Sequence, residues 1–269
     1  MDLFIELNNL ISKYRFYPKK GSGLHFAVRN SLVKEVIALA DLNKSDKVLE
    51  VNAGEFFFAR KLSEKAFLTA FEERKELIKL LEKELKGIKL ISSSFVSFSG
   101  KINSNKCVSF ISSGNSGEIF LKLLEFDFDL MVLLLHKDFS ERILAEPGFS
   151  DYGFLSVLSD LLFETTEVIQ VKPNYFFPPT SGDFFLIKFI KRKKIRIKNK
   201  KDFFEFVKAL FRFKNRVFPS ALSKALPLMN LDKKTKNKIK EKMSETEFNE
   251  KVYLMEPEDF LQLFNKLTK

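Results

Sequence analysis

The sequence predicts an α/β fold in which a parallel sheet is followed by a small helical domain. Short apolar runs alternate with helical patterns through most of the chain, and helical patterns alone follow the basic segment Lys191–Lys201. Strands that alternate with helices are typical of a parallel sheet covered by helices on both faces. The change of pattern near residue 190 predicts two domains, residues 1–190 and residues 191–269.

The size and composition agree with such a globular chain. Its 269 residues allow one large domain and a small second one, and 45% hydrophobic with 30% charged residues argue against a disordered chain. No apolar run approaches the roughly 18 residues of a membrane span, and charged residues interrupt the first segment, unlike a signal peptide. We expect a cytoplasmic monomer that does not contact membranes.

The expected elements follow one another in a regular order. An amphipathic helix is expected around residues 2–14, with a loop at Pro18 and Gly21–Gly23 after it. Asn30 or Ser31 should cap the next helix. Buried strands are expected at Lys47–Val51, Phe67–Phe71, Gly87–Ile91, Cys107–Ser112 and Asp129–Leu135. Helices are expected between several of them, at Phe57–Glu64, Arg74–Leu85 and Glu118–Leu124.

The last two apolar runs, Glu167–Lys172 and Asp183–Ile190, are separated by a Pro-rich turn rather than by a helix. They should form an antiparallel pair at the sheet edge. Five alternating strands followed by a closing hairpin are the order of a Rossmann-like class I methyltransferase sheet. Helical patterns then build the C-terminal domain, at Asp202–Phe213, Val217–Met229, Lys233–Met243 and Glu258–Leu267.

Charge and cysteine content limit the kinds of partner and site. The formal net charge of +11 favours a polyanionic partner such as nucleic acid, although a lysine-rich proteome would also make a protein basic. Cys107 is the single cysteine, and its apolar neighbours predict a buried thiol. His25 and His136 are the only histidines, so a Cys/His zinc site cannot form and no metal is expected.

Five ordered blocks resemble the KsgA-type ribosomal RNA adenine dimethyltransferase family. They are GSGLHFAVRNSLVKEVIALADL (21–42), KVLEV (47–51), DLMVLLLHKDFSERILAEPGFSDYGFLSVL (129–158), YFFPP (175–179) and LFRFKNRVFPSAL (210–222). The family has similar segments: "GQHFL", the strand before the cofactor loop, "QKE…AERL…YGRLSV", "FxPxP" and a basic helix "FQHRNK…RKAL". The short first helix and the tail EKVYLMEPEDFLQLFNKL resemble the archaeal branch.

This resemblance implies a fold and an activity. Members of the family bind S-adenosylmethionine and dimethylate two adjacent adenosines near the 3′ end of small-subunit rRNA. Their fold is a Rossmann-like methyltransferase domain with a helical C-terminal domain, which agrees with the element order above.

The cofactor loop departs from the family pattern E-x-G-x-G-x-G. The matching residues are Glu50, Asn52, Gly54 and Phe56, so only the middle glycine is kept. Glycine lets a backbone approach a ligand where a Cβ would occupy its space. Asn52 can replace glycine because Asn accepts unusual backbone angles. Phe56, with two further Phe residues after it, should fill the cofactor's space or force the loop outward.

Three further cofactor positions can be matched to the family. Glu72 ends the next strand, where the family has an acid for the ribose hydroxyls; it could equally be an acid favoured by the helix dipole. The family's G-D-A segment corresponds to Ile91–Phe95, which has no carboxylate. Leu24 replaces the Gln of "GQHF", and His25 follows it as a vestigial cofactor contact.

The segment that corresponds to the family's catalytic loop differs most from the family pattern. The family reads N-[LI]-P-[YF], in which the Asn and a backbone carbonyl hold the exocyclic amine and the aromatic ring stacks on a flipped adenine. This chain has no proline and no aromatic residue there, and Asn115 is displaced from the family's spacing. The degenerate loop consists of Ser112, Ser113, Gly114 and Asn115. Since most of the functional motifs fail together, we expect methyl transfer to be lost and no cofactor to be needed.

Basic residues predict where RNA binds. The basic residues of segment Lys191–Lys201 could instead belong to a solvated linker or an edge strand, because the periodicity of this segment does not favour either. Those of block 210–222 correspond to the family's RNA-facing helix, which favours phosphate contact. The candidate RNA-binding residues are Lys191, Arg192, Lys193, Lys194, Arg212, Lys214 and Arg216.

The preferred hypothesis is a catalytically inactive protein that binds small-subunit rRNA or a 30S-type ribosomal particle during assembly or as an occupancy factor. One alternative is an active S-adenosylmethionine-dependent dimethyltransferase that uses Glu72 and a remodelled loop. A second is a scaffold recruited to the transcription machinery, as in mitochondrial transcription factors related to this family. Phe56 discriminates the first two, because an active enzyme needs its ring outside the cofactor site.

Overall fold

The computed structural model describes residues 2–19, 23–112, 114–243 and 247–269. By packing, the chain forms two compact units: residues 1–140 with 165–191, and residues 141–164 with 192–269. Segment 141–164, which includes α7 (Phe154–Leu162), packs within the second unit. The expected division into residues 1–190 and 191–269 placed this segment in the first domain. As a statement about independent domains it stays a prediction.

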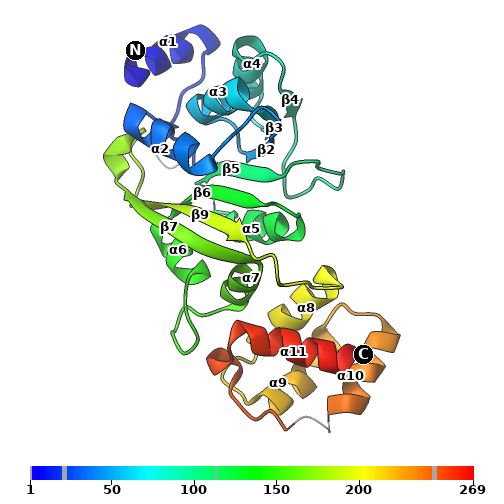
Figure 1. Cartoon of the computed structure of the whole chain (residues 1–269). Helices are drawn as coiled ribbons and strands as arrows, with labels where there is room; N and C mark the ends of the chain where they lie inside the picture. Colours follow the sequence, from blue (N-terminus) through cyan, green and yellow to red (C-terminus); the bar gives the residue numbers. More distant parts are fainter. Residues whose placement is uncertain (1, 20–22, 113, 244–246) are drawn as a thin grey trace. The chain divides into compact units, whose positions relative to one another are not determined.

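The first unit is built on a seven-stranded sheet with the order β4-β3-β2-β5-β6-β9-β7 (Figure 1). The strands from β2 to β6 are parallel, and β9 pairs antiparallel with β6. Their bounds are β2 (Lys47–Val51), β3 (Phe67–Phe71), β4 (Lys89–Ile91), β5 (Lys106–Ile111), β6 (Leu130–His136), β7 (Phe163–Val171) and β9 (Phe184–Lys191). The expected sheet is therefore confirmed, and β7 lies beside β9 at its edge. The predicted strand ends differ by up to four residues, at the start of β7.

Mostly apolar runs explain the central strands. Every residue of β5 is buried, as are all residues of β6 except the last, which is the pattern of parallel strands covered on both faces. Cys107 lies in β5 as a buried thiol, and burial raises its pKa to about 12. This confirms the expectation of a buried residue.

Helices pack on both sides of these strands in the first unit. Figure 1 shows α3 and α4 on one side and α5 on the other, as right-handed crossovers between the parallel strands require. The helices are α1 (Leu3–Tyr14), α2 (Asn30–Ala40), α3 (Phe56–Lys65), α4 (Lys75–Glu84) and α5 (Ser116–Glu125), with α6 (Lys137–Ile143) following β6. The expected cap of α2 is wrong: Asn30 is its first helical residue, and Arg29 precedes it without a side-chain cap bond.

A small second sheet joins two of the sequence blocks noted above. Strand β1 (Phe26–Ala27) pairs antiparallel with β8 (Phe176–Phe177), which follows the short 3₁₀ helix Pro173–Tyr175. His25 and Pro178 flank this pair, and His25 Nδ1 lies 2.7 Å from the carbonyl oxygen of Pro178. The pairing brings the segment before α2 to the Pro-rich turn before β9.

The second unit is helical. Besides α7 it contains α8 (Lys200–Phe211), α9 (Phe218–Ala225), α10 (Lys233–Met243) and α11 (Pro257–Thr268), with 3₁₀ turns at Leu226–Leu228 and Val252–Leu254. Its core includes Phe203, Phe206 and Phe264, which pack as a ring cluster. The Tyr152 hydroxyl donates to the Met255 carbonyl at 2.8 Å within the same unit. No helix among the described residues has the length and apolar character needed to cross a membrane.

Candidate functional site

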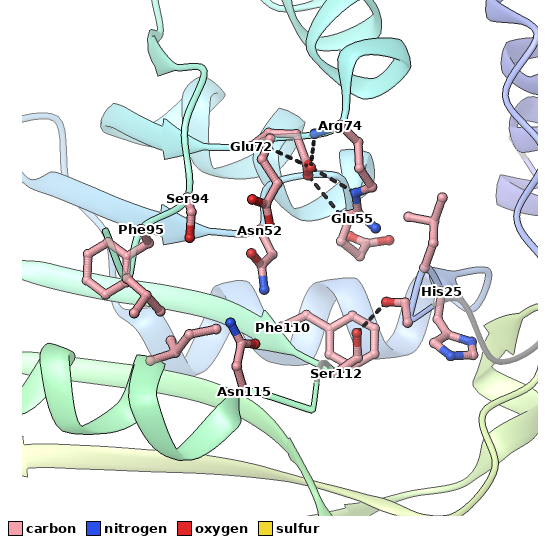
Figure 2. Close-up of a pocket in the computed structure, with 15 residues that line it drawn as sticks. His25, Asn52, Glu55, Glu72, Arg74, Ser94, Phe95, Phe110, Ser112 and Asn115 are labelled. Carbon is pink, nitrogen blue, oxygen red and sulfur yellow. Dashed lines mark hydrogen bonds and ion pairs between the residues drawn. The ribbon is translucent and has the colours of Figure 1, made fainter. Parts of the chain in front are cut away.

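A pocket of about 170 Å³ opens at the carboxyl ends of the parallel strands (Figure 2). The chain leaves β2 toward β3 on one side and returns to β5 on the other, so this is the switch point where ligands bind in open α/β sheets. The volume is below the roughly 300–1,000 Å³ of usual small-molecule sites. The lining residues are Gly23, Leu24, His25, Asn52, Glu55, Glu72, Glu73, Arg74, Ser94, Phe95, Val96, Phe110, Ser112, Asn115 and Ile119.

The pocket brings together many of the residues that the sequence singled out. Leu24, His25, Asn52 and Glu72 line it, and Ser112 and Asn115 join them from the loop after β5. Glu50, Gly54, Phe56 and Gly114 are not among the lining residues. Ser113, the remaining member of the predicted loop, lies outside the described residues.

Asn52 follows β2 directly and adopts the left-handed conformation, with φ 58°. Asn tolerates this region better than most residues that carry a Cβ. The turn that the first glycine of such a loop provides is therefore kept, as the sequence predicts, and the Asn52 side chain points into the pocket (Figure 2).

Glu72 lies after β3, is 2% exposed and has its carboxylate surrounded by donors of the protein itself. Its Oε1 accepts from the backbone N–H groups of Glu73 and Arg74, both at 3.0 Å, and from Arg74 Nε at 2.8 Å. Its Oε2 accepts from Gly54 N at 2.8 Å and from Arg74 Nη2 at 2.9 Å. A carboxylate offers about four lone-pair positions, so the Glu72 oxygens are saturated.

This saturation changes the role expected of Glu72. A ribose binds through its two hydroxyl donors, and they find no free acceptor while the Arg74 fork is in place. The backbone bonds from the residues that lead into α4 also make Glu72 an acid favoured at a helix N-terminus. The arrangement fits that structural role, and it fits a ribose only after Arg74 moves away.

Gly54 lies against the ion pair of Glu72 and Arg74, where a side chain would not fit. A Cβ on Gly54 would lie 2.5 Å from Leu77 Cδ1, 2.7 Å from Glu72 Oε2 and 2.8 Å from Arg74 Nη2. These separations are far shorter than van der Waals contact allows. The glycine therefore permits the close approach of Glu72 and Arg74 to the loop.

The expectation that Phe56 fills the cofactor site is wrong. Phe56 is the first residue of α3 and is 2% exposed within the hydrophobic core. Its ring packs edge-on against Phe57, at 5.6 Å between centroids, and beneath the Arg60 guanidinium at 5.3 Å. The physical reason is Glu55, which begins the helix: its Oε2 accepts from Phe58 N and its Oε1 from Ala27 N, both bonds fixing how α3 starts.

Two aromatic rings do border the pocket, although the sequence did not indicate them. Phe95 is 3% exposed and packs edge-on against Phe71, at 5.3 Å between centroids. Phe110 stacks on Phe176, with centroids 5.0 Å apart. Both rings are held in the core, so neither resembles an exposed platform for a flipped base.

The loop after β5 retains one amide at the pocket. Asn115 precedes α5 and its side chain points into the pocket (Figure 2). Ser112 Oγ donates to the Gly23 carbonyl at 2.6 Å, which ties this loop to the segment before β1. On the facing wall, Ser94 occupies the region where the sequence lacks a carboxylate.

Burial raises the pKa of two carboxyls near the pocket. Glu50 is fully buried, and neither oxygen has a hydrogen-bond partner among the described residues. Burial, with repulsion from Glu55 and Glu72, raises the pKa of Glu50 well above its usual value. Burial likewise raises the pKa of Glu55 to about 8, although its two backbone donors oppose the shift. Glu72 is the acid whose negative charge Arg74 balances.

The predicted RNA-binding residues fall into two groups. Three are engaged within the protein: Lys191 Nζ lies 2.6 Å from Asp127 Oδ1, Arg192 Nη2 lies 3.0 Å from Asp160 Oδ1, and Lys214 Nζ donates to the Ser150 carbonyl at 2.8 Å. Four have exposed side chains, namely Lys193, Lys194, Arg212 and Arg216. The expected basic helix of block 210–222 is wrong in part, because α8 ends at Phe211 and the basic residues form the turn before α9.

Pro219 at the second position of α9 accounts for where that helix begins, since proline is favoured in the first helical turn. Arg74 and Glu55 also line the pocket, although no sequence motif predicted them there. The signals for them were weak: an Arg two residues beyond an acid, and an acid one residue before a helical pattern.

Comparisons with known proteins agree with this geometry. The family model described as ribosomal RNA adenine dimethylase matches residues 16–269. The chain is 30% identical to "Probable ribosomal RNA small subunit methyltransferase A" of Methanococcus maripaludis, over 92% of this chain and 97% of that protein. It is 28% identical to ribosomal RNA small subunit methyltransferase A of Clostridium botulinum, over 84% of this chain and 86% of that protein.

Two solved structures share the fold. A dimethyladenosine transferase from Plasmodium falciparum superposes with a TM-score of 0.72 at 20% identity, covering 89% of this chain and 97% of the other. The 23S rRNA methyltransferase ErmE superposes with a TM-score of 0.60 at 19% identity, covering 91% of this chain and 100% of the other. These similarities confirm the class I methyltransferase fold that the order of strands predicts.

Proposed function

The chain belongs to the ribosomal RNA adenine dimethylase family, and from this membership we propose that it binds small-subunit rRNA or a 30S-type particle without transferring methyl groups. One observation carries the second half of the proposal. The Glu72 carboxylate, where a cofactor's ribose would be bound, is saturated by Arg74 and three backbone donors.

The remaining pocket residues support the same conclusion. S-adenosylmethionine supplies an electrophilic methyl group, and the family holds its adenine near an acid that this chain lacks between Ser92 and Phe95. The loop 112–117 contains no aromatic ring to stack on a flipped adenine. In this arrangement the residues present do not fit the cofactor, and we expect at most weak binding of it.

Binding to RNA is supported by exposed cations in the second unit. Arg212 and Arg216 are exposed in one turn, and Lys193 and Lys194 are exposed in the segment before α8. Each phosphate contact by a lysine or arginine releases a counterion, so affinity for the rRNA should fall steeply as salt rises. Such a protein could act in assembly or occupy the subunit.

An active dimethyltransferase is the second candidate, and two observations favour it. Phe56 lies in the core and leaves the pocket open, and Asn115 reaches the pocket despite its displaced position. Arg74 would then have to leave Glu72 when the cofactor binds.

Two measurements test the proposal. First, the purified protein is titrated with S-adenosylmethionine and with S-adenosylhomocysteine up to millimolar concentration. Second, transfer of a labelled methyl group is measured on small-subunit particles whose adenosines are unmethylated. We expect no more than weak binding and no transfer; micromolar binding together with transfer would establish the second candidate.

The RNA part has its own test. Binding to a 3′ fragment of small-subunit rRNA is compared with binding to duplex DNA of equal length across low to moderate salt. A preference for the rRNA with a steep salt dependence supports the proposal. A preference for the duplex DNA would instead favour recruitment to transcription machinery.

A further inference from the structure

The excess positive charge of the chain is confined to its last part. Residues 192–269 contain 21 Lys and Arg against 10 Asp and Glu, whereas residues 1–191 contain 25 of each. The whole formal charge of +11 therefore belongs to residues 192–269. Helix α10 alone has six lysines and one glutamate, and Ile239 is its single buried residue. A polyanion should be attracted here more than to the rest of the chain.

A second pocket lies within this charged part. Its volume is about 490 Å³, within the roughly 300–1,000 Å³ of sites that enclose small molecules. Its walls belong to the second unit. They are formed by the segment before α8, the start of α8, one residue of α10 and the end of α11. The lining residues are Arg196, Lys198, Asn199, Asp202, Thr235, Phe264, Asn265, Thr268 and Lys269.

Most uncharged polar side chains of the lining are already engaged. Asn199 donates to Asp202 Oδ2 at 2.7 Å, Thr235 Oγ1 donates to Asp232 at 2.6 Å, and Thr268 Oγ1 donates to the Phe264 carbonyl at 2.7 Å. Asn265 differs, because its side-chain amide has no hydrogen-bond partner among the described residues. An amide offers both donors and an acceptor, so Asn265 can pair with the edge of a nucleobase.

The charged groups around this amide select for a phosphorylated ligand. Arg196 and Lys198 have exposed side chains on the wall before α8. The one acidic side chain of the lining, Asp202, accepts a hydrogen bond from Asn199. Phe264 contributes an apolar surface held by two neighbouring rings. Cations, one free amide and an apolar wall together match a base with its adjacent phosphates.

We propose that this pocket binds one unpaired nucleotide of an RNA strand, its flanking phosphates on Arg196 and Lys198 and its base edge on Asn265. The inference rests on the proposed binding to rRNA and adds which form of RNA is bound. Proteins read RNA mainly where bases are unpaired and can be turned outward. A base within a duplex is stacked and paired and cannot enter a cavity of this kind.

The test compares Asn265→Leu with the wild-type chain on two RNA probes of equal length, one single-stranded and one a hairpin stem. We expect Asn265→Leu to weaken single-strand binding about tenfold and to change stem binding less than twofold. The double variant Arg196→Ala/Lys198→Ala should reduce the slope of log affinity against log salt by about 1.4, or about 0.7 per lost phosphate contact on a single strand.

Lys224→Ala is the matched control, because Lys224 is exposed on α9 outside the pocket. It should leave the ratio of single-strand to stem affinity unchanged. If Asn265→Leu loses affinity equally for both probes, and its melting curve matches that of the wild type, the proposal that this pocket binds a nucleotide is wrong. A further titration uses a 5′-phosphorylated trinucleotide alone. If the chain binds the rRNA fragment but not the trinucleotide, the pocket is wrong and the proposed function stands; if it binds neither, both fail.

Discussion

Removing the Arg74 side chain should open the ribose position of the first pocket. Arg74→Ala deletes two of the five hydrogen bonds to the Glu72 carboxylate and leaves those from the backbone of residues 54, 73 and 74. Hydrogen bonds to charged groups contribute about 1.5–3 kcal/mol each. Because the Arg74 side chain is 30% exposed, we take about 1.5–3 kcal/mol for the pair together. Displacing Arg74 thus weakens ligand binding by roughly 10- to 100-fold, at about 1.4 kcal/mol per tenfold.

The assay is calorimetric titration with S-adenosylhomocysteine, which binds without reacting. Arg74→Ala should bind it roughly 10- to 100-fold more tightly than wild type. Lys75→Ala, an exposed change at the first position of α4, should leave the affinity unchanged. If Arg74→Ala folds normally and binds no better than wild type, the pair with Arg74 does not block the ribose position.

Three further predictions concern stability. The free energy of unfolding should fall as the pH rises above 4.5, because the folded chain keeps the Glu50 proton above that usual pKa and the unfolded chain does not. Glu50→Gln should remove this contribution, which is about 1.4 kcal/mol per pH unit. Urea unfolding across pH measures the change, with the exposed Glu73→Gln as the control. Gly54→Ala should cost about 1–3 kcal/mol by overpacking against Leu77, whereas Gly114→Ala, with nothing within 4 Å, should cost little in the same denaturation experiment. Tyr152→Phe should lower the stability of the second unit by about 1 kcal/mol through the lost bond to Met255, measured by hydrogen exchange.

The strands and helices could be predicted because their signals are local. Apolar runs predicted β2 and β3 with the bounds that the structure has. Helix α4 lies within the expected segment Arg74–Leu85, and Leu77, Leu80 and Leu81 form its buried apolar stripe. The packing of residues 141–164 with the C-terminal helices could not be predicted in this way, because it depends on contacts between segments far apart in the sequence.

The site was less predictable because a motif gives positions without directions. Matching the cofactor loop placed Phe56 where glycine is usual, yet its ring turns into the core once Glu55 begins α3. The spacing of Asn115 differs from that of the family's catalytic Asn, yet Asn115 follows β5 closely enough to line the pocket. Whether Arg74 folds onto Glu72 depends on the backbone path from β3 into α4, which no pattern in the sequence specifies.

Glu55 gives a test of the pocket that does not depend on catalysis. Its carboxyl lines the pocket, and burial raises its pKa to about 8. It is therefore neutral below that pH and negative above it. S-adenosylmethionine carries a positive sulfonium, whereas S-adenosylhomocysteine has a neutral sulfur. Attraction between opposite charges is strong where water is excluded, so the ratio of their affinities should shift toward S-adenosylmethionine as the pH rises through 8.

Arg74→Ala is the suitable background for this measurement, because its affinity should be high enough to follow between pH 6.5 and 9. Comparing the two ligands at each pH cancels any change in folding, since both bind the same protein. Glu55→Ala in the same background should remove the pH dependence of the ratio. A ratio that stays constant over this range in the Arg74→Ala protein would mean that the Glu55 charge does not reach the ligand's sulfur, and the pocket would then bind the nucleoside end alone.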